Sequence, residues 1–199
     1  GSQVKEVINY RRAIFSGQDL LKKQGFLKLK DIEFLQKTII ENNAGLRNMA
    51  GTVLKNDKTG EIVYTPPQEK NEILDLLGNF LEHYNIKQND FPPLINLAIL
   101  HYQFESIHPF YDGNGRTGRI INVLYLVMND LLDLPILYLS RYIIKNKGDY
   151  FKLLQEVRET ENWENWIMYM LNAVEEISKE TLVLIEKIKE LMAEYKTTL

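Results

Sequence analysis

The sequence predicts an all-α protein that carries one small β-hairpin. Apolar residues return every three or four positions along most of the chain, which is the spacing of one helix face. Two stretches, residues 52–54 and 61–65, are short and β-branched and predict strands. The 199 residues are 45% hydrophobic, which is enough for one sizeable core. We therefore expect a single domain over residues 1–199, with helical extensions at both of its ends.

The first part of the chain predicts two helices and then the hairpin. Residues 4–15 and 31–43 carry apolar side chains at helical spacing. Gly17 is a predicted stop for the first helix, and Asp31 is a predicted N-cap for the second. Residues 55–60 are rich in turn formers and separate the two strands, so they are expected to form the turn of the hairpin.

The rest of the chain predicts a series of helices. They are expected over residues 71–84, 94–106, 116–129, 149–160 and 163–199, with a helix or turn around residues 138–144. The helix over residues 94–106 is apolar nearly all round, which is typical of a central buried helix. Pro109 is expected to end it.

Charge and composition exclude several classes of partner. The net charge is −3, with 24 basic and 27 acidic residues well mixed, so no basic field exists to attract nucleic acid or an acidic membrane. Cysteine is absent, which fits a reducing compartment. No apolar run approaches the roughly 18 residues of a membrane span, and no signal peptide is expected. These features predict a cytoplasmic protein.

The stretch HPFYDGNGRTGR, residues 108–119, is the most informative part of the sequence. It holds one histidine, one carboxylate, three glycines and two arginines, and it leads directly into an apolar helix. The start of a helix presents unpaired N–H groups that favour an anion. Glycine lets the backbone come close to that anion, and arginine adds charged donors. The stretch therefore predicts a phosphate-binding loop with a general base and a metal ligand beside it.

Four side chains of this stretch are candidates for chemistry. His108 is placed at a helix end beside the anion loop, where an imidazole suits a general base. Asp112 suits Mg²⁺ beside phosphates, and the alternative is a bond that stabilises a turn. Arg116 and Arg119 are three positions apart, share a helix face and suit a polyphosphate. Their alternative is a pair of surface ion pairs.

Two common nucleotide motifs do not fit this stretch. Residues 113–118 match G-x-G-x-x-G, but a dinucleotide-binding fold needs a strand before the glycines, and here a helix is predicted. A P-loop needs a Lys-Ser/Thr pair after the glycines, which is absent. The other histidines, His83 and His101, lie on predicted helices and are expected to be structural.

In the full pattern HPFxDGNGRxxR, the chain resembles the Fic (filamentation induced by cAMP) family. Further stretches similar to bacterial members extend the resemblance over most of the chain: residues 6–10, 64–67, 101–107, 137–140 and 163–167. The resemblance implies a Fic-type helical bundle in which the hairpin is a flap. It also implies the transfer of AMP from ATP to a hydroxyl side chain of a target protein, with release of pyrophosphate.

The resemblance implies a role for each residue of this chain that matches a functional residue of the family. His108 would accept the proton of the target hydroxyl, and Asp112 would hold Mg²⁺. The flap residues Val63, Tyr64 and Thr65 would align the target segment by strand addition. Binding of ATP is implied for Gly113, Asn114, Gly115, Arg116, Thr117, Gly118, Arg119, Tyr150, Phe151 and Arg158.

Variants of the motif in relatives indicate which group this protein would transfer. Relatives with a lysine at the second motif glycine transfer phosphate, so Gly115 favours AMP, and the intact Gly-Asn-Gly disfavours phosphocholine. The implied partners are ATP and a protein with a Ser, Thr or Tyr hydroxyl, the protein itself among the candidates. A homodimer is left open. The alternatives are a nucleotide-sensing regulatory module, a toxin–antitoxin partner or, in a full-length form, an enzyme that removes AMP from modified proteins.

The resemblance also implies a regulator. Many members are inhibited by a helix with the pattern Ser/Thr-x-x-x-Glu-Gly/Asn, whose glutamate pairs with the second motif arginine, here Arg119. Residues 160–165 match by letter, but they fall in a Trp-rich segment that aligns with ordinary domain sequence. In relatives that share residues 6–10 the inhibitory helix lies just upstream. Residues 1–2 resemble a cloning scar, so we expect that this helix has been removed and the fragment is active, and a C-terminal winged-helix domain is a further expected loss.

Overall fold

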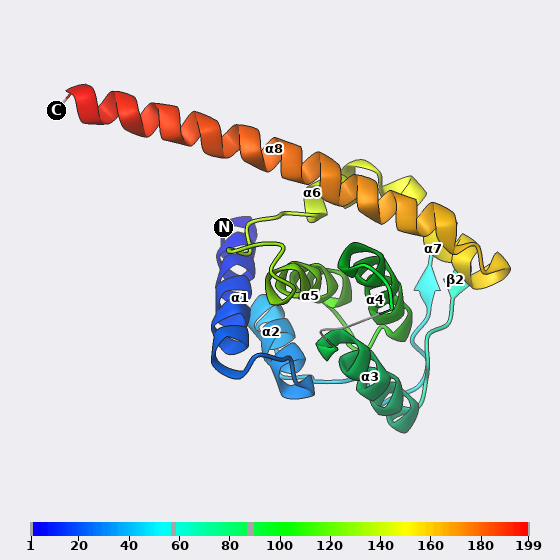
Figure 1. Ribbon diagram of the computed structural model, residues 1–199. Coiled ribbons are helices and arrows are strands. Elements are labelled where there is room, and N and C mark those ends of the chain that lie inside the picture. Colours follow the sequence, from blue (N-terminus) through cyan, green and yellow to red (C-terminus); the bar gives the residue numbers. More distant parts are fainter. Residues whose placement is uncertain (1, 57–58, 87–89, 199) are drawn as a thin grey trace. The chain divides into compact units, whose positions relative to one another are not determined.

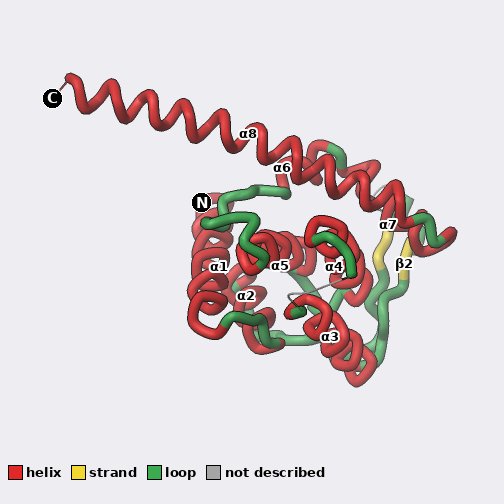
Figure 2. Tube along the Cα trace, viewed as in Figure 1, coloured by secondary structure: helices red, strands yellow, loops and turns green. Residues whose placement is uncertain are grey.

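The computed structural model describes residues 2–56, 59–86 and 90–198. In that part of the chain, eight helices and a two-stranded antiparallel sheet are present, so the predicted all-α fold with one hairpin is confirmed (Figures 1 and 2). The chain divides into two compact units, Gly1–Pro135 and Ile136–Leu199. The expectation of one domain over residues 1–199 stays a prediction.

The first unit is built around two helices, α4 and α5. Its elements are α1 Ser2–Gln24, α2 Leu29–Ile40, β1 Leu54–Lys55, β2 Ile62–Tyr64, α3 Lys70–Asn85, α4 Pro93–Ile107 and α5 Asn114–Met128. Helix α5 contacts α1, α2 and α4, and α3 packs against α4. The central position of α5 explains why nearly every residue after its first turn is buried.

Aromatic side chains fix α3 against α4 and α5. The ring of Phe80 lies 5.7 Å from that of Tyr84 and 5.6 Å from that of Phe104, measured between centroids. The ring of Tyr84 meets that of Tyr125 edge-on at 5.2 Å, and its hydroxyl donates to the carbonyl oxygen of Ile121 at 2.8 Å. A tyrosine is stable in this core because its one polar group is satisfied.

Two predictions about the first helices were wrong. Gly17 does not end α1, which continues to Gln24. A Cβ atom at Gly17 would lie 2.5 Å from Cδ1 of Leu124, so the glycine serves a close contact between α1 and α5. Asp31 is not the N-cap of α2 but lies in its first turn, where its carboxylate accepts the backbone N–H of Lys28 at 2.8 Å.

The hairpin pairs Leu54 with Tyr64 and Lys55 with Ile62. Its strands are shorter than predicted, and part of the predicted turn, residues 57–58, lies outside the described residues. The hydroxyl of Tyr64 donates to the carbonyl oxygen of Ser106 at 2.9 Å. This bond attaches the hairpin to α4, and an isolated hairpin of this size needs such support.

The second unit consists of α6 Ser140–Lys145, α7 Lys147–Thr160 and α8 Trp163–Thr198. The first half of α8 packs on α6 and α7. The buried side chains of Tyr150 and Trp166 have ring centroids 5.6 Å apart, and Trp166 stacks on Tyr169 at 6.0 Å. These rings form the core of the unit.

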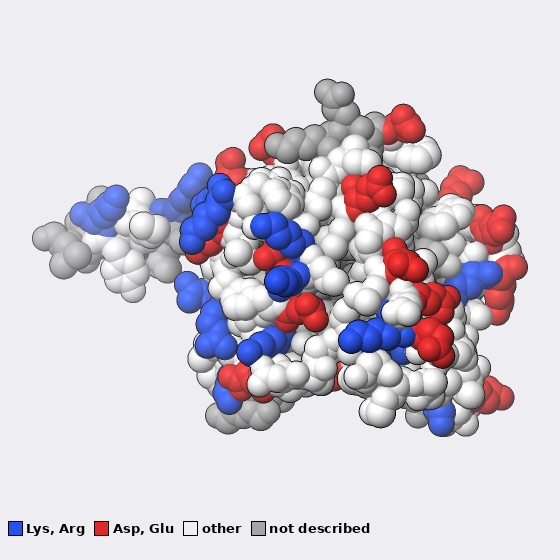
Figure 3. All heavy atoms as spheres, turned by 90° about the horizontal axis from the view of Figure 1, so that it is seen from below, with Lys and Arg blue, Asp and Glu red and all other residues white. Residues whose placement is uncertain are grey.

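The surface carries charged side chains of both signs (Figure 3). Figure 3 shows basic and acidic side chains interspersed over one face, in line with the small net charge of −3. Among the helices that the structure describes, none combines the length and the apolar character that crossing a membrane requires.

Candidate active site

His108 directly follows α4 and has a left-handed backbone, with φ 48° and ψ 57°. This conformation costs about 1 kcal/mol for a residue other than glycine. Two bonds hold it: the N–H of His108 donates to the carbonyl oxygen of Phe104 at 3.0 Å, and its own carbonyl oxygen accepts Nε of Arg47 at 2.6 Å. The half-buried imidazole is therefore attached to a backbone whose position is fixed.

Arg47 is a site residue that the sequence did not indicate. Its side chain has no exposed surface, and besides His108 it donates to the carbonyl oxygens of Ile107, at 3.2 Å, and Pro67, at 2.9 Å. Burial lowers the pKa of the guanidinium, against the raising effect of Tyr111 and Tyr64. A cation at the C-terminal end of α4 is also favoured by the helix dipole. Arg47 thus links the end of the hairpin segment to the backbone of His108.

Buried side chains hold the backbone of the loop between α4 and α5 in place. Phe110 is fully buried, and the side chain of Asn114 bonds both its N–H, at 2.8 Å, and its carbonyl oxygen, at 2.7 Å. Gly113 has φ 85°, and a Cβ there would lie 2.6 Å from Cγ1 of Ile40. Glycine is therefore required at the N-cap of α5, where the amides of the first helical turn have no helical partner.

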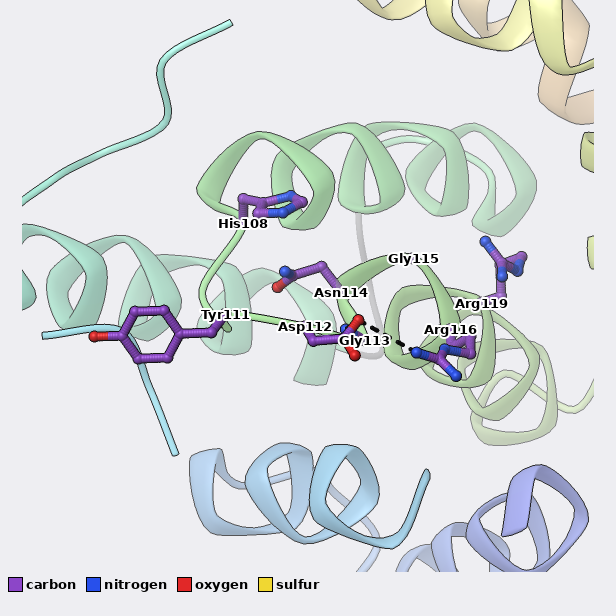
Figure 4. A pocket seen from close by; sticks show the side chains of 8 residues that line it. All are labelled: His108, Tyr111, Asp112, Gly113, Asn114, Gly115, Arg116 and Arg119. Atoms are coloured by element: carbon purple, nitrogen blue, oxygen red, sulfur yellow. Dashed lines mark hydrogen bonds and ion pairs between the residues drawn. The ribbon is translucent and has the colours of Figure 1, made fainter. Parts of the chain in front are cut away.

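These elements surround one pocket of about 290 Å³. Figure 4 shows the side chains of Asp112, Arg116 and Arg119 around the first turn of α5, with His108 across from them. The structure thus brings together seven of the predicted site residues: His108, Asp112, Gly113, Asn114, Gly115, Arg116 and Arg119.

Tyr111 completes the lining and was not predicted. Its side chain extends away from the two arginines (Figure 4). The hydroxyl accepts the backbone N–H groups of Asn48, at 3.0 Å, and Met49, at 3.2 Å, and donates to Oδ1 of Asn48 at 2.9 Å. These bonds tie the segment after Arg47 to the motif loop.

The two motif arginines have different surroundings. Arg116 donates to Oε1 of Glu6 at 2.7 Å and to Oδ1 of Asp112 at 3.3 Å. It therefore makes the surface ion pairs that the sequence left as the alternative, and such exposed pairs stabilise little. Arg119 instead lies over Gly115, where a Cβ atom would be 3.0 Å from its Nη1. A larger residue at position 115 would displace this guanidinium.

The two histidines outside the motif lie outside the pocket lining. His101 is 1% exposed, and burial followed by the charge of Arg119 lowers its pKa to about 3. It is therefore neutral at physiological pH. His83 is exposed on α3, with its Nδ1 3.2 Å from the carbonyl oxygen of Asn79.

Thr117 and Gly118 lie on the buried side of α5, away from the pocket lining. A Cβ at Gly118 would be 3.0 Å from Cδ1 of Phe104 and 2.7 Å from Oε1 of Glu105. Gly118 therefore allows α5 to approach α4 closely. Contact of these two residues with ATP stays a prediction.

Two of the three predicted flap residues are exposed. Val63, on β2, is 46% exposed, and Thr65, just after β2, is also exposed. Tyr64 is half-buried and faces α4. The sheet has two strands in the described part of the chain, so the hairpin offers an outer edge.

The predicted adenosine residues all belong to α7 in the second unit. Tyr150 is 4% exposed in the aromatic core, whereas Phe151 is 54% exposed. Nη1 of Arg158 donates to Oε1 of Gln155 at 3.4 Å. Their contact with ATP stays a prediction.

The regulatory pattern at residues 160–165 does not form one helix. Thr160 ends α7, Glu161 has a left-handed backbone with φ 57°, and Trp163 begins α8. In the inhibitory helix that the resemblance implies, the Ser/Thr and the glutamate would lie on one helix. Residues 160–165 thus span the junction of α7 and α8, and their assignment to ordinary domain sequence stays a prediction.

Comparison with known proteins gives a consistent result. The model of the Fic/DOC family matches residues 26–126. A protein adenylyltransferase Fic of Aedes aegypti is 32% identical over 114 residues, which is 57% of this chain and 21% of that protein. A protein of the same name from Drosophila grimshawi is 46% identical over 61 residues, 30% of this chain and 11% of that protein. The chain thus spans about a fifth or less of the length of these two relatives.

Solved structures show the same fold. A Fic family protein from Desulfovibrio desulfuricans G20 superposes with a TM-score of 0.70 at 21% identity, covering 90% of this chain and 54% of that chain. A Fic domain containing signaling protein from Bacteroides thetaiotaomicron VPI-5482 gives a TM-score of 0.62 at 20% identity, covering 88% and 67%. At these identities the similarity concerns the fold alone.

Proposed function

Because the chain belongs to the Fic/DOC family and its motif residues line one pocket, we propose that it is a protein adenylyltransferase. The observation that carries this proposal is that His108 and the first turn of α5 open into the same pocket. One supplies a base and the other an anion site, as the transfer of a nucleotide requires. The names of the relatives from Aedes aegypti and Drosophila grimshawi support the same activity.

The proposed reaction joins AMP to a hydroxyl group of a protein. His108 accepts the hydroxyl proton, the hydroxyl oxygen bonds to the α-phosphorus of ATP, and the bond from that phosphorus to the bridging oxygen breaks. Pyrophosphate leaves with the electrons of the broken bond. The first-turn amides of α5 and the guanidinium of Arg119 favour charge on the phosphates, and positioning and charge are the main sources of rate in such transfers.

The residues of the pocket suit Mg²⁺. In the described part of the chain no three acidic or histidine side chains gather as a metal cage. Mg²⁺ is commonly held by one or two carboxylates together with substrate phosphates and waters, which fits the single carboxylate of Asp112 in an anion pocket. When bound, Mg²⁺ would neutralise charge on the phosphates. Asp112 would then exchange its contact with Arg116 for the metal.

The hairpin suits the protein substrate. Residues Val63 and Thr65 are exposed beside an open strand edge. We infer that an extended target segment pairs with this edge and presents a Ser, Thr or Tyr hydroxyl to His108. Contacts of Tyr150, Phe151 and Arg158 with adenosine belong to the same proposal, as does the cytoplasm as the location, which agrees with the absence of cysteine.

The deciding experiment compares two labels on ATP. Incubation of the chain, Mg²⁺ and candidate proteins with ATP labelled on the α-phosphate is expected to label protein, whereas a label on the γ-phosphate is expected to leave as pyrophosphate. His108→Ala should lower the rate by roughly a hundredfold or more, and His83→Ala, on the exposed side of α3, should leave it unchanged. Transfer of the γ label, or ATP binding without transfer to any protein, would contradict the proposal.

A further inference from the structure

The second half of α8 exposes an apolar face. In the first half, Trp166, Met170, Ala173 and Ile177 are buried within the second unit. The same side of the helix continues at Leu184, 58% exposed, Ile188, 48%, Leu191, 52%, and Tyr195, 65%. These four residues form the α8 stripe. In Figure 1 this part of α8 is the orange-to-red segment that ends at the C-terminus.

The spacing of the stripe is that of a coiled coil. Its members are four, three and four positions apart, which corresponds to alternating d and a positions of a heptad. The two flanks of the stripe differ. Ile185 and Met192 continue the apolar surface on one flank, at e positions, and Lys187 and Glu194 lie on the other, at g positions.

We propose that the α8 stripe pairs with the stripe of a second copy of this chain as an antiparallel two-stranded coiled coil. In this arrangement Ile188 lies opposite Leu191 of the second copy, and Leu184 lies opposite Tyr195 of the second copy. The g positions of antiparallel helices face each other. Lys187 is then opposite Glu194 of the second copy, and the two-fold symmetry makes this pair twice.

Charge and apolar contact both favour this register. A shift by one heptad in one direction places Lys187 opposite Lys187 of the second copy. The opposite shift places Glu194 opposite Glu194 of the second copy. In the proposed register Ile185 lies opposite Met192 of the second copy, so the apolar flanks also meet. Like charges facing each other destabilise such pairings.

A parallel dimer would not use these charges. There each g residue faces the e residue five positions later on the other helix, so Lys187 would face Met192. Four layers of apolar residues form a short coiled coil. The association is therefore expected to depend on protein concentration, and the orientation should be sensitive to the flanking charges.

Sedimentation of the whole chain over a range of concentrations tests the surface. The expected result is a monomer–dimer equilibrium, in which Ile188→Asp raises the dissociation constant by roughly tenfold or more. Leu182→Asp is the matched control, because Leu182 is 60% exposed on the same helix but points away from the stripe. A chain that stays monomeric at every concentration, or that dimerises equally with Ile188→Asp, overturns the proposal.

Charge exchange tests the register. Lys187→Glu and Glu194→Lys are each expected to weaken dimerisation roughly fivefold, because two attractive pairs become repulsive. The double variant restores opposite charges and should return within about twofold of the original affinity. Single variants that leave the dimer unchanged would contradict the antiparallel register.

Spin-label distances test the orientation directly. The chain contains no cysteine, so Glu186→Cys and Lys179→Cys each provide one label, both on the outer side of α8. With a rise of about 1.5 Å per residue, the antiparallel dimer separates the two labels along the axis by about 10 Å at position 186 and about 30 Å at position 179. Equal distances at the two positions would show a parallel dimer and overturn the proposal.

Discussion

At the scale of single residues, Arg47 fixes the backbone position of His108. Its buried guanidinium reaches the carbonyl oxygens of His108, Ile107 and Pro67. These oxygens come from the end of α4 and from the segment after the hairpin. Arginine suits the position because its planar fork offers several donors in fixed directions, which lysine does not.

Replacement of Arg47 should separate positioning from stability. Arg47→Met leaves three carbonyl oxygens without their donor and is expected to cost about 2–5 kcal/mol in the free energy of unfolding. Arg47→Lys keeps the charge and should retain the fold, while kcat for AMP transfer falls and the KM for ATP changes little. Urea unfolding and steady-state kinetics measure these effects. Arg141→Met, at a side chain 70% exposed, is the control and should cost less than about 1 kcal/mol.

His101 should make stability depend on pH. Its pKa is lowered from 6.5 to about 3 by burial and by the charge of Arg119. Between these values the unfolded chain binds a proton that the folded chain does not bind, so the free energy of unfolding falls as pH falls below about 6.5. The slope reaches about 1.4 kcal/mol per pH unit, which predicts a loss of about 2 kcal/mol between pH 7 and pH 5.

The matched variant for this effect is His101→Gln. It removes the titrating group, so its loss of stability between pH 7 and pH 5 should be smaller than that of the original chain by about 2 kcal/mol. Urea unfolding at both pH values gives the comparison. Equal losses in the two proteins would show that another group controls the acid response.

At the scale of elements, the sequence predicts those features that depend on residues close together in the chain. Helices were found close to their expected positions because burial of one face leaves a spacing that can be counted. The prediction for Gly17 was wrong because glycine permits both a helix end and a close helix contact, and Leu124, its neighbour in space, is far away in sequence. The sequence does not indicate the roles of Arg47 and Tyr111 for the same reason, since their partners come from other segments. The motif was predictable because its residues are contiguous.

The start of α5 depends on a glycine for two separate reasons, which can be distinguished. Gly113→Ala combines a positive φ of 85° with a Cβ placed 2.6 Å from Cγ1 of Ile40. Gly25→Ala has a similar φ of 76° but open space around its Cβ. We expect about 1 kcal/mol of destabilisation for Gly25→Ala and roughly 2–4 kcal/mol for Gly113→Ala.

A double-mutant cycle assigns the extra cost at Gly113. If crowding by Ile40 causes it, Ile40→Ala and Gly113→Ala together should destabilise by less than the sum of the single changes. Urea unfolding of the four proteins measures the difference. Strict additivity, or equal costs at Gly113 and Gly25, would exclude the steric explanation.

At the scale of the whole molecule, binding and stability are coupled. A ligand that binds only the folded chain raises the free energy of unfolding by about 2.7 kcal/mol at a hundred times its dissociation constant. For a chain of this size that corresponds to a rise in Tm of roughly 5–10 °C. ATP with Mg²⁺ is expected to produce such a shift because the first turn of α5 and Arg119 line the phosphate pocket.

Single substitutions should change this ATP-dependent rise in Tm only where the replaced side chain contributes to ATP binding. His108→Ala is expected to keep it, because a base for the target hydroxyl contributes to transfer more than to ATP binding. Arg119→Ala should reduce the shift by about half or more, since a charged hydrogen bond to phosphate contributes about 1.5–3 kcal/mol. Arg11→Ala, on α1 and outside the pocket lining, is the matched control and should behave as the original chain does. Differential scanning calorimetry with and without ATP and Mg²⁺ provides the measurement. An unchanged shift in Arg119→Ala would show that this arginine does not bind the phosphates.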